Sequence, residues 1–518
     1  MDKHERPMPP QAARQRVSDT RHGITRHDDY AWLRADNWQA VMQDPALLPS
    51  GIRDYLEAEN AYTEAAMRGS EALQEQLFRE MKGRIKEDDS SVPAPDGPYA
   101  YYSSHVMDGQ QPLYCRKPRD LAGAEQILID GNKEGEGKPF FRFGGLSVSP
   151  DHTRLAWSFD DKGSEFYRIH VRELLTGTDL ADEVANTAGG AVWTADGKSI
   201  LYTHQDENHR PLKIYRHMLG TDATADTLIY EETDTGFFTG VGKTQSERFI
   251  VIDAHDHETS ESWLIDATSP GAEPRLVAPR RKGIEYDIDD NGDELFIHTN
   301  ADDAEDYKIV RAPLSDPSPA YWTDLVPHRP GCLILGMVVR KNWLVRLERE
   351  DGLPRIVIRD LKDGAEHAIA FDEDAYALGF GEMLEYETDM LRFTYSSMTT
   401  PSEVFDYNMS TRERSLRKRQ EVPSGHDASQ YVTRRLQAPA PDGETVPVTL
   451  LYRKDTPLTD RRRCGSMATA PTASPFRRRS TPIYFRWWTA VLSMPSPIPA
   501  AARIRATAGT STASATRR

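Results

Sequence analysis

The chain has 518 residues, of which 38% are hydrophobic and 28% are charged, as in soluble folded proteins with two or three domains. Its net charge of -17 argues against nucleic acid as the main partner, because phosphate binding requires a basic surface. No apolar run reaches the roughly 18 residues of a membrane span, and the N-terminus shows no signal peptide. We therefore expect a cytoplasmic protein without a membrane partner.

Residues 1–80 are predicted to form a helical N-terminal extension. A helix-forming stretch starts at Tyr55 and continues through Ala66. In the next stretch Leu73, Leu77 and Met81 recur at four-residue intervals, which places them on one stripe of a helix.

From about residue 95 the pattern changes to short alternating strands that follow polar turns. Seven such turns begin at Asp96, Asp151, Asp196, Ser246, Asn291, Lys341 and Glu387. Their spacing of about 45–55 residues is typical of a β-propeller with one four-stranded blade per repeat. The sequence thus predicts a mainly β protein with a seven-bladed β-propeller over residues 81–420. Two stacked sheets with chance spacing are the alternative.

A new pattern follows the last repeat. Two strands, 431–436 and 446–452, flank a hairpin turn at Asp442-Gly443, and we assign residues 421–459 to the start of another domain. Residues 460–518 lack alternation and hold eleven arginines, no lysine and one acid. Their net charge is +10, which leaves 53 basic and 80 acidic residues, or -27, for residues 1–459. We expect this self-repelling tail to be disordered.

Two segments were considered as metal sites. Residues 287–292 match the first half of a calcium-binding loop, but its twelfth position, where a bidentate Glu is needed, is His298. A polar turn between blades is the preferred interpretation. In His255-Asp256-His257-Glu258 the two histidines would share one face of a strand, yet no third ligand is evident, which favours a solvated loop.

No catalytic motif is present either. The Gly-x-Ser-x-Gly turn of serine hydrolases is missing, and its nearest match, residues 509–513, ends in Ala513. No glycine-rich phosphate loop occurs. Cys115, Cys332 and Cys464 are widely spaced, and we expect unpaired thiols in a reducing compartment. We therefore assign no catalytic, cofactor-binding or metal-binding residue and no cofactor.

Several stretches are similar to the oligopeptidase B branch of the prolyl oligopeptidase family. The resemblance extends over about residues 6–458 and is carried by residues 22–34 (HGITRHDDYAWLR), 83–93 (GRIKEDDSSVP), 206–217 (DENHRPLKIYRH), 400–407 (TPSEVFDY) and 450–454 (LLYRK).

The resemblance implies a seven-bladed propeller that caps an α/β-hydrolase domain, whose Ser-Asp-His triad cuts short peptides after Lys or Arg. Short basic peptides would be the partners of intact relatives. The triad, and the acids that bind the basic side chain, would lie beyond residue 458, so none of them is assigned in this chain. Residues 421–459 would be a short remnant of the hydrolase domain.

A shift of the reading frame accounts for the tail. Read one nucleotide earlier, the codons of Cys464 to Ala473 can encode Val-Trp-Leu-Tyr-Gly-Tyr-Gly-Ala-Tyr-Gly, which resembles the family's sequence after its first hairpin. The same shift between Pro497 and Thr510 can give a second family-like stretch. We therefore expect a frameshift near Thr459 and a chain that does not cut peptides. The alternatives are a stand-alone propeller that binds peptides or proteins, and a genuine basic tail that binds anionic partners.

Overall fold

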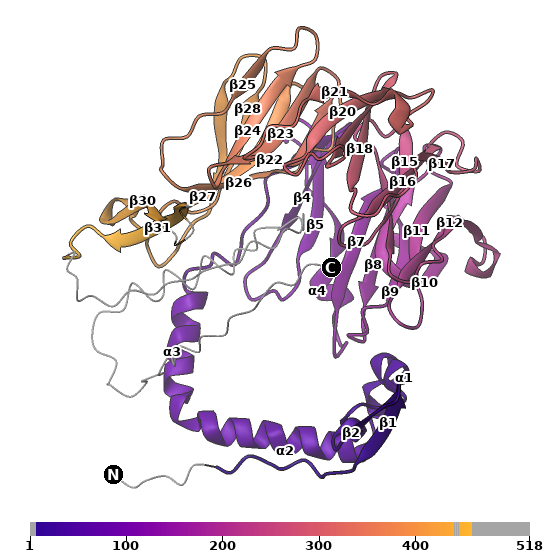
Figure 1. Ribbon diagram of the computed structural model, residues 1–518, viewed down its shortest axis with the longest axis vertical. Coiled ribbons are helices and arrows are strands. Elements are labelled where there is room, and N and C mark those ends of the chain that lie inside the picture. The colour runs from indigo at the N-terminus through magenta and orange to yellow at the C-terminus, as the bar shows by residue number, and fades with distance from the viewer. Residues whose placement is uncertain (1–6, 440, 442, 444, 458–518) are drawn as a thin grey trace. The chain divides into compact units, whose positions relative to one another are not determined.

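The computed structural model describes residues 7–439, 441, 443 and 445–457 (Figure 1). The expected disorder of residues 460–518, and Cys464 with it, lies outside the described residues. No helix in the described part of the chain is long and apolar enough to cross a membrane.

The N-terminal part contains the predicted helices. A hairpin of β1 (Val17–Arg21) and β2 (Ile24–Asp28) precedes α1 (Trp38–Gln43), α2 (Ser50–Met67) and α3 (Glu71–Lys82). Figure 1 shows α2 and α3 as separate helices. The apolar stripe of α3 is not buried, because Leu73 is 51% exposed and no residue of this helix is buried.

The short helices connect the longer elements. They are η1 (Ala31–Leu33), η2 (Pro45–Leu47), η3 (Arg68–Ser70), α4 (Gly131–Glu134), η4 (Ala223–Ala225), η5 (Pro319–Tyr321) and η6 (Ala428–Gln430).

Five antiparallel four-stranded sheets are each built from consecutive strands. The first contains β3 (Ala94–Asp96), β4 (Tyr99–Ser104), β5 (Leu113–Pro118) and β6 (Gln126–Asp130). The next contains β14 (Phe238–Lys243), β15 (Phe249–His255), β16 (Ser260–Asp266) and β17 (Arg275–Ala278). It is followed by β18 (Tyr286–Asn291), β19 (Glu294–Thr299), β20 (Lys308–Pro313) and β21 (Thr323–Val326). The fourth contains β22 (Cys332–Arg340), β23 (Trp343–Glu350), β24 (Leu353–Asp360) and β25 (Glu366–Ala368). The last contains β26 (Tyr376–Phe380), β27 (Met390–Ser397), β28 (Glu403–Asn408) and β29 (Arg414–Arg419).

The sixth sheet has seven strands. They are β7 (Arg142–Val148), β8 (Arg154–Asp160), β9 (Tyr167–Glu173), β10 (Thr178–Trp193), β11 (Ser199–Gln205), β12 (Pro211–Met218) and β13 (Thr227–Glu231). The prediction of seven separate four-stranded sheets is therefore wrong in this respect. The reason is the 16-residue β10, which pairs with β9 through its first part and with β11 through its last.

The seven-stranded sheet bends within β10. The Trp193 indole nitrogen in β10 donates to the Ser147 carbonyl of β7 over 2.8 Å, although β8 and β9 separate these strands in the sheet order. At the bend, Gly189 has a φ of +95°, and a Cβ placed on Gly145 of β7 would lie 2.7 Å from the Gly189 carbonyl oxygen. Glycine is thus needed where the two backbones meet.

The seven turns found in the sequence occupy equivalent places. They connect β3 to β4, β7 to β8, β10 to β11, β14 to β15, β18 to β19, β22 to β23 and β26 to β27. Each therefore joins a first strand to the second strand of a repeat.

Apolar contacts hold neighbouring sheets together. Five clusters each join two sheets and contain, in chain order, Ile129 with Leu155, Ile214 with Ile250, Leu264 with Leu295, Ile309 with Leu344, and Ile356 with Phe393. Each such side chain contributes about 1.5–3 kcal/mol by leaving water. The last sheet also contacts the segment before the first one, since Arg392 donates to the Pro93 carbonyl. The sheets thus close into a ring, which is the β-propeller architecture.

The loop between β26 and β27, residues 381–389, reaches across one end of this ring. Its Glu385 pairs with Arg119, next to the first sheet. Its Leu384 carbonyl accepts from the Gln245 side chain over 3.3 Å, and its Tyr386 carbonyl accepts from the Lys341 amide over 3.3 Å. The loop therefore links the last sheet with three others at the end where the seven turns lie.

The bend in β10 can be tested with adjacent glycines. We expect Gly189→Ala to lower the free energy of unfolding by roughly 2–4 kcal/mol, because the positive φ is strained for alanine and its Cβ would lie 3.1 Å from the Gly144 Cα. Gly190→Ala is the control, since a Cβ there meets nothing within 4 Å. Denaturant titration measures both, and equal effects of the two substitutions would refute the bend.

The ring end also predicts a pH effect. Burial raises the pKa of Asp289 to about 7, although its Oδ1 accepts from the Gln245 and Asp290 amides. Between about pH 4 and 7 the unfolded chain loses a proton that the folded chain retains, so this residue destabilises the fold as pH rises. We expect the melting temperature of Asp289→Asn to exceed that of the original chain more at pH 8 than at pH 5. A difference that does not change with pH would contradict this.

Candidate functional site at the seam of the ring

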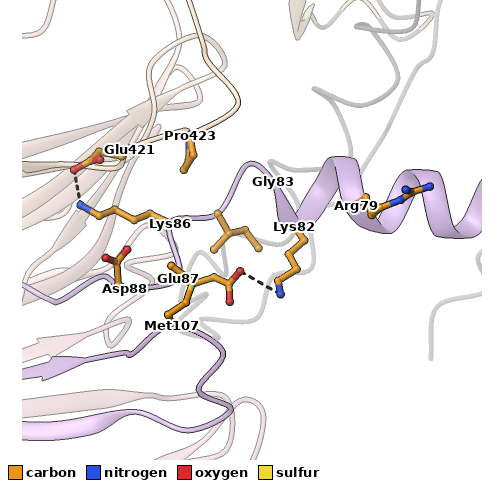
Figure 2. Close-up of a pocket in the computed structure, with 10 residues that line it drawn as sticks. Arg79, Lys82, Gly83, Lys86, Glu87, Asp88, Met107, Glu421 and Pro423 are labelled. Carbon is orange, nitrogen blue, oxygen red and sulfur yellow. Dashed lines mark hydrogen bonds and ion pairs between the residues drawn. The ribbon is translucent and has the colours of Figure 1, made fainter.

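We call the junction between the first sheet, β3–β6, and the last sheet, β26–β29, the seam of the ring. Two chain segments run side by side there. Residues 83–93 lead from α3 into β3, and residues 420–430 lead from β29 toward the terminal hairpin of β30 (Tyr431–Pro439) and β31 (Thr445–Arg453). The Lys86 ammonium lies 2.8 Å from the Glu421 carboxylate and so joins the two segments directly (Figure 2). This hydrogen bond raises the pKa of Lys86.

A groove of about 570 Å³ lies at this crossing. It is lined by Arg79, Lys82, Gly83, Ile85, Lys86, Glu87, Asp88, Met107, Glu421 and Pro423. Figure 2 shows Lys82 reaching toward Glu87, and their charged atoms are 3.2 Å apart. The lining thus holds three basic and three acidic side chains, and Lys82 and Lys86 are each paired with one of the acids.

Arg392 makes the most buried contact of the seam. Its side chain is 5% exposed and forms two hydrogen bonds, of 2.7 and 3.0 Å, with the Asp406 carboxylate on the neighbouring strand. Its Nη1 also donates to the carbonyl oxygens of Val92 and Pro93, at 3.2 and 2.9 Å. One guanidinium therefore connects the last sheet with the segment that leads into the first.

A second cation supports the same junction closer to the surface. Lys418 of β29 lies 2.6 Å from the Asp89 carboxylate and also donates to the Ser90 carbonyl. Among the described residues, no cluster of buried apolar side chains combines the first and last sheets, in contrast to the five junctions between the other neighbours. Charged side chains and backbone carbonyls hold the seam instead.

The groove at the seam is not lined by groups typical of a hydrolase. Its lining contains no Ser, Thr, Cys or His, the usual nucleophiles and bases of hydrolases. What the arrangement can do is mechanical. Exposed ion pairs contribute little to stability, so the Lys86–Glu421 contact can open while the hydrogen bonds from the buried Arg392 to the Val92 and Pro93 carbonyls keep the ring closed.

A second cavity, of about 450 Å³, lies between the β18–β21 and β22–β25 sheets and contains the buried thiol of Cys332. Burial raises the pKa of this thiol, which donates to Glu348 over 3.4 Å. A protonated thiol is a poor nucleophile. The thiol sulfur also accepts from Arg355 over 3.7 Å, and Arg355 is in turn paired with Glu348.

The segments considered as metal sites have structural roles. We predicted a polar turn for residues 287–292, but most of them belong to β18. The Asp290 carboxylate accepts hydrogen bonds from Ser246 and Arg248. His298 is buried in β19 with its Nε2 3.1 Å from the Ile334 carbonyl. In the other segment the Asp256 carboxylate accepts from the backbone amides of a turn. Within the described ranges no group of three or more His, Cys, Asp or Glu could hold a metal ion.

The remaining motifs fix local structure. In residues 206–217, the His209 ring packs on Phe166 and Arg210 donates to the carbonyls of Thr235 and Phe237, which ties the β11–β12 turn to its neighbours. In residues 22–34, the Trp32 indole donates to the Ala13 carbonyl over 2.7 Å. Two of the motifs meet at the seam, namely residues 83–93 and residues 400–407, whose Asp406 pairs with Arg392.

Sequence analysis missed the partners of the motif at residues 83–93. Arg392, Lys418 and Glu421 lie about 300 residues away from it in the chain. The basic run Arg417-Lys418-Arg419 in an otherwise acidic body is the one signal that could have drawn attention to the last strand.

The seam predicts unequal effects for its two ion pairs. We expect Arg392→Met to lower the free energy of unfolding by about 3–5 kcal/mol, because it leaves Asp406 buried with less compensation and the Val92 and Pro93 carbonyls without their donor. Lys86→Met should change it by less than about 1 kcal/mol, since the side chains of Lys86 and Glu421 are 33% and 65% exposed. Urea titration compares them, and a loss below 1 kcal/mol for Arg392→Met would refute its role.

Comparison with known proteins agrees with this architecture. Residues 9–420 match the family described as prolyl oligopeptidase, N-terminal beta-propeller domain. Dipeptidyl aminopeptidase BI of Pseudoxanthomonas mexicana is 38% identical over 86% of this chain and 63% of its own length. Protease 2 of Moraxella lacunata is 32% identical over 83% of this chain and 61% of its own length.

Solved structures of oligopeptidase B are also similar to this chain. Oligopeptidase B from Leishmania major superposes with a TM-score of 0.79 at 31% identity, over 87% of this chain and 66% of that one. Oligopeptidase B from Trypanosoma brucei with covalently bound antipain, in a closed form, has the same score at 30% identity. The chain spans less than two thirds of the length of the curated relatives it matches. It belongs to the prolyl oligopeptidase family, and its residues 9–420 are the N-terminal β-propeller of that family.

Proposed function

We propose that the chain is the substrate-gating propeller part of a serine-type oligopeptidase that cuts short peptides after Lys or Arg. The observation that carries this proposal is the seam. The chain enters and leaves the ring through two segments that lie side by side and are joined by the exposed Lys86–Glu421 pair. A paired connection of this kind lets a ring move against whatever follows it while the ring itself stays closed.

The relatives supply the specificity part of the proposal. The names oligopeptidase B and protease 2 belong to proteins that this chain matches over 83–87% of its residues. Cleavage after Lys or Arg, short basic peptides as partners and a cytoplasmic location come to this chain as proposals from that likeness.

We also propose a count of seven blades and a division of the chain. The bent seven-stranded sheet would be two blades that share β10, which agrees with the seven equivalent turns. The N-terminal extension would cover residues 1–80, the propeller 81–420 and the remnant of the hydrolase domain 421–459. The β30–β31 hairpin would be the first element of that domain.

The chain of 518 residues is proposed to be inactive toward peptides. Its sequence contains no Gly-x-Ser-x-Gly turn, and we find no activated nucleophile in the lining of the groove at the seam or of the cavity at Cys332. Nucleophilic catalysis needs a serine or cysteine activated by a base, together with donors for the oxyanion.

The proposal is tested by comparing two gene products. We expect the purified 518-residue chain to leave Arg- and Lys-containing peptides uncut above background. Restoring one nucleotide near the codon of Thr459 should lengthen the product and produce cleavage after Lys or Arg that a serine-directed inhibitor abolishes. Inhibitor-sensitive turnover by the 518-residue chain would contradict the proposed inactivity, and cleavage after other residues by the restored product would contradict the proposed specificity.

A binding measurement on the same material addresses the other function considered. If the 518-residue chain binds a fluorescent Arg-containing peptide tightly while the restored product shows no peptidase activity, the stand-alone binding module is the better account. The acidic body would then be the source of affinity, and binding should weaken as salt is added.

A further inference from the structure

Arg340 has an unusual environment for a charged residue. It is the last residue of β22, and only 2% of its surface is exposed. Its Nη2 reaches the Met383 carbonyl at a distance of 3.5 Å, the limit of a hydrogen bond. Its Nε and Nη1 have no hydrogen-bond partner among the described residues. Buried donors of this kind are rare, because each costs free energy unless it finds an acceptor.

The charge of Arg340 also lacks an ion pair. Asp289 and Glu385 are the acids that act on it, but neither comes within the 4.0 Å of a salt bridge among the described residues. Asp289 accepts from two backbone amides, and Glu385 is paired with Arg119. Burial accordingly lowers the pKa of the Arg340 guanidinium to about 10.

The position of Arg340 in the ring limits what could reach it. Met383 belongs to the β26–β27 loop, which spans this end of the ring and contacts the β14–β15 turn through Leu384 and Gln245. The guanidinium of β22 thus lies between this loop and Asp289 of β18. A group enclosed there must be small, and it must bring acceptor atoms for two N–H donors.

We propose that Arg340 is an anion-binding residue that holds a small inorganic anion such as chloride at its Nε and Nη1 atoms. A water molecule would satisfy the two donors but would leave the buried charge uncompensated, whereas an anion does both. The bound anion would stabilise β22 next to the β26–β27 loop and so strengthen the end of the ring where the seven turns lie. This site is independent of the proposed peptidase function.

The test compares chloride with gluconate, an anion too large for the enclosed position. A ligand that binds only the folded state raises the melting temperature as its concentration rises. At constant ionic strength, we expect replacement of gluconate by chloride to raise the melting temperature of the 518-residue chain by about 2 °C or more. In Arg340→Met this rise should disappear, and the variant in gluconate should melt at or above the temperature of the original chain.

Arg346→Met is the matched control. Arg346 is also buried, but it forms ion pairs with Glu348 and Glu366, so its loss should destabilise the chain and leave the response to chloride intact. If this variant does not fold, Arg359→Met replaces it, because Arg359 pairs with Glu366 at a more exposed position.

A direct binding measurement completes the test. The chloride NMR line width should broaden in the presence of the original chain and much less with Arg340→Met. Equal melting temperatures in chloride and gluconate, without line broadening, would mean that ordered water alone serves the two donors and would overturn the proposal. A chloride response that survives in Arg340→Met would place the anion elsewhere. The melting temperature is also measured with acetate in place of chloride. A rise with acetate but not with chloride would overturn the proposal that the bound anion is a small inorganic one.

Discussion

The structure depends on how a ring of sheets closes when its first and last sheets share no strand. Each sheet is built from strands that are consecutive in the chain, so no backbone pairing joins β29 to β3. The other junctions rely on buried apolar side chains, which are not directional and tolerate small shifts. The seam relies on Arg392, whose planar group bonds to Asp406 on one side and to the Val92 and Pro93 carbonyls on the other. Such a contact requires both partners at fixed positions.

This mode of closure suits a part that moves as a unit. The buried Arg392 holds the ring through the Val92 and Pro93 carbonyls, while the exposed Lys86–Glu421 pair lies on the two connecting segments. Because exposed and buried ion pairs differ in strength, the connection can flex without opening the ring. At the end where the seven turns lie, the β26–β27 loop adds a further connection, because it contacts three other sheets through Leu384, Glu385 and Tyr386.

Much of the fold could be predicted from the sequence because strands and turns are local features. The turns at Asp96, Asp151 and Asn291 recur with a blade-like period, and each joins a first strand to a second. The merger of two repeats at Gly189 could not be predicted, because it depends on close contact with Gly145 of another strand. The unburied stripe at Leu73 could not be predicted either, since helical periodicity shows which face is apolar and not what covers it.

Only one of the two sides of the seam could be predicted from the sequence, because its contacts join residues that are far apart in the chain. Residues 83–93 stand out as a motif, but their partners Arg392 and Lys418 come from the far end of the chain, and single charges carry no periodic signal. The burial of Arg340 could not be predicted from the sequence either. A basic residue at the end of a strand normally faces solvent, and Arg340 is buried by contacts with distant segments such as the β26–β27 loop.

The 518-residue chain forms a closed ring that polar contacts hold together at the seam. Hydrogen–deuterium exchange of the purified chain tests it most directly, because backbone amides in an open ring would exchange through local unfolding. The account predicts that peptides from β3–β6 and β26–β29 are protected as strongly as those from β14–β17 and β18–β21. Rapid exchange confined to the first and last sheets would show that the ring is open at the seam and would contradict the account.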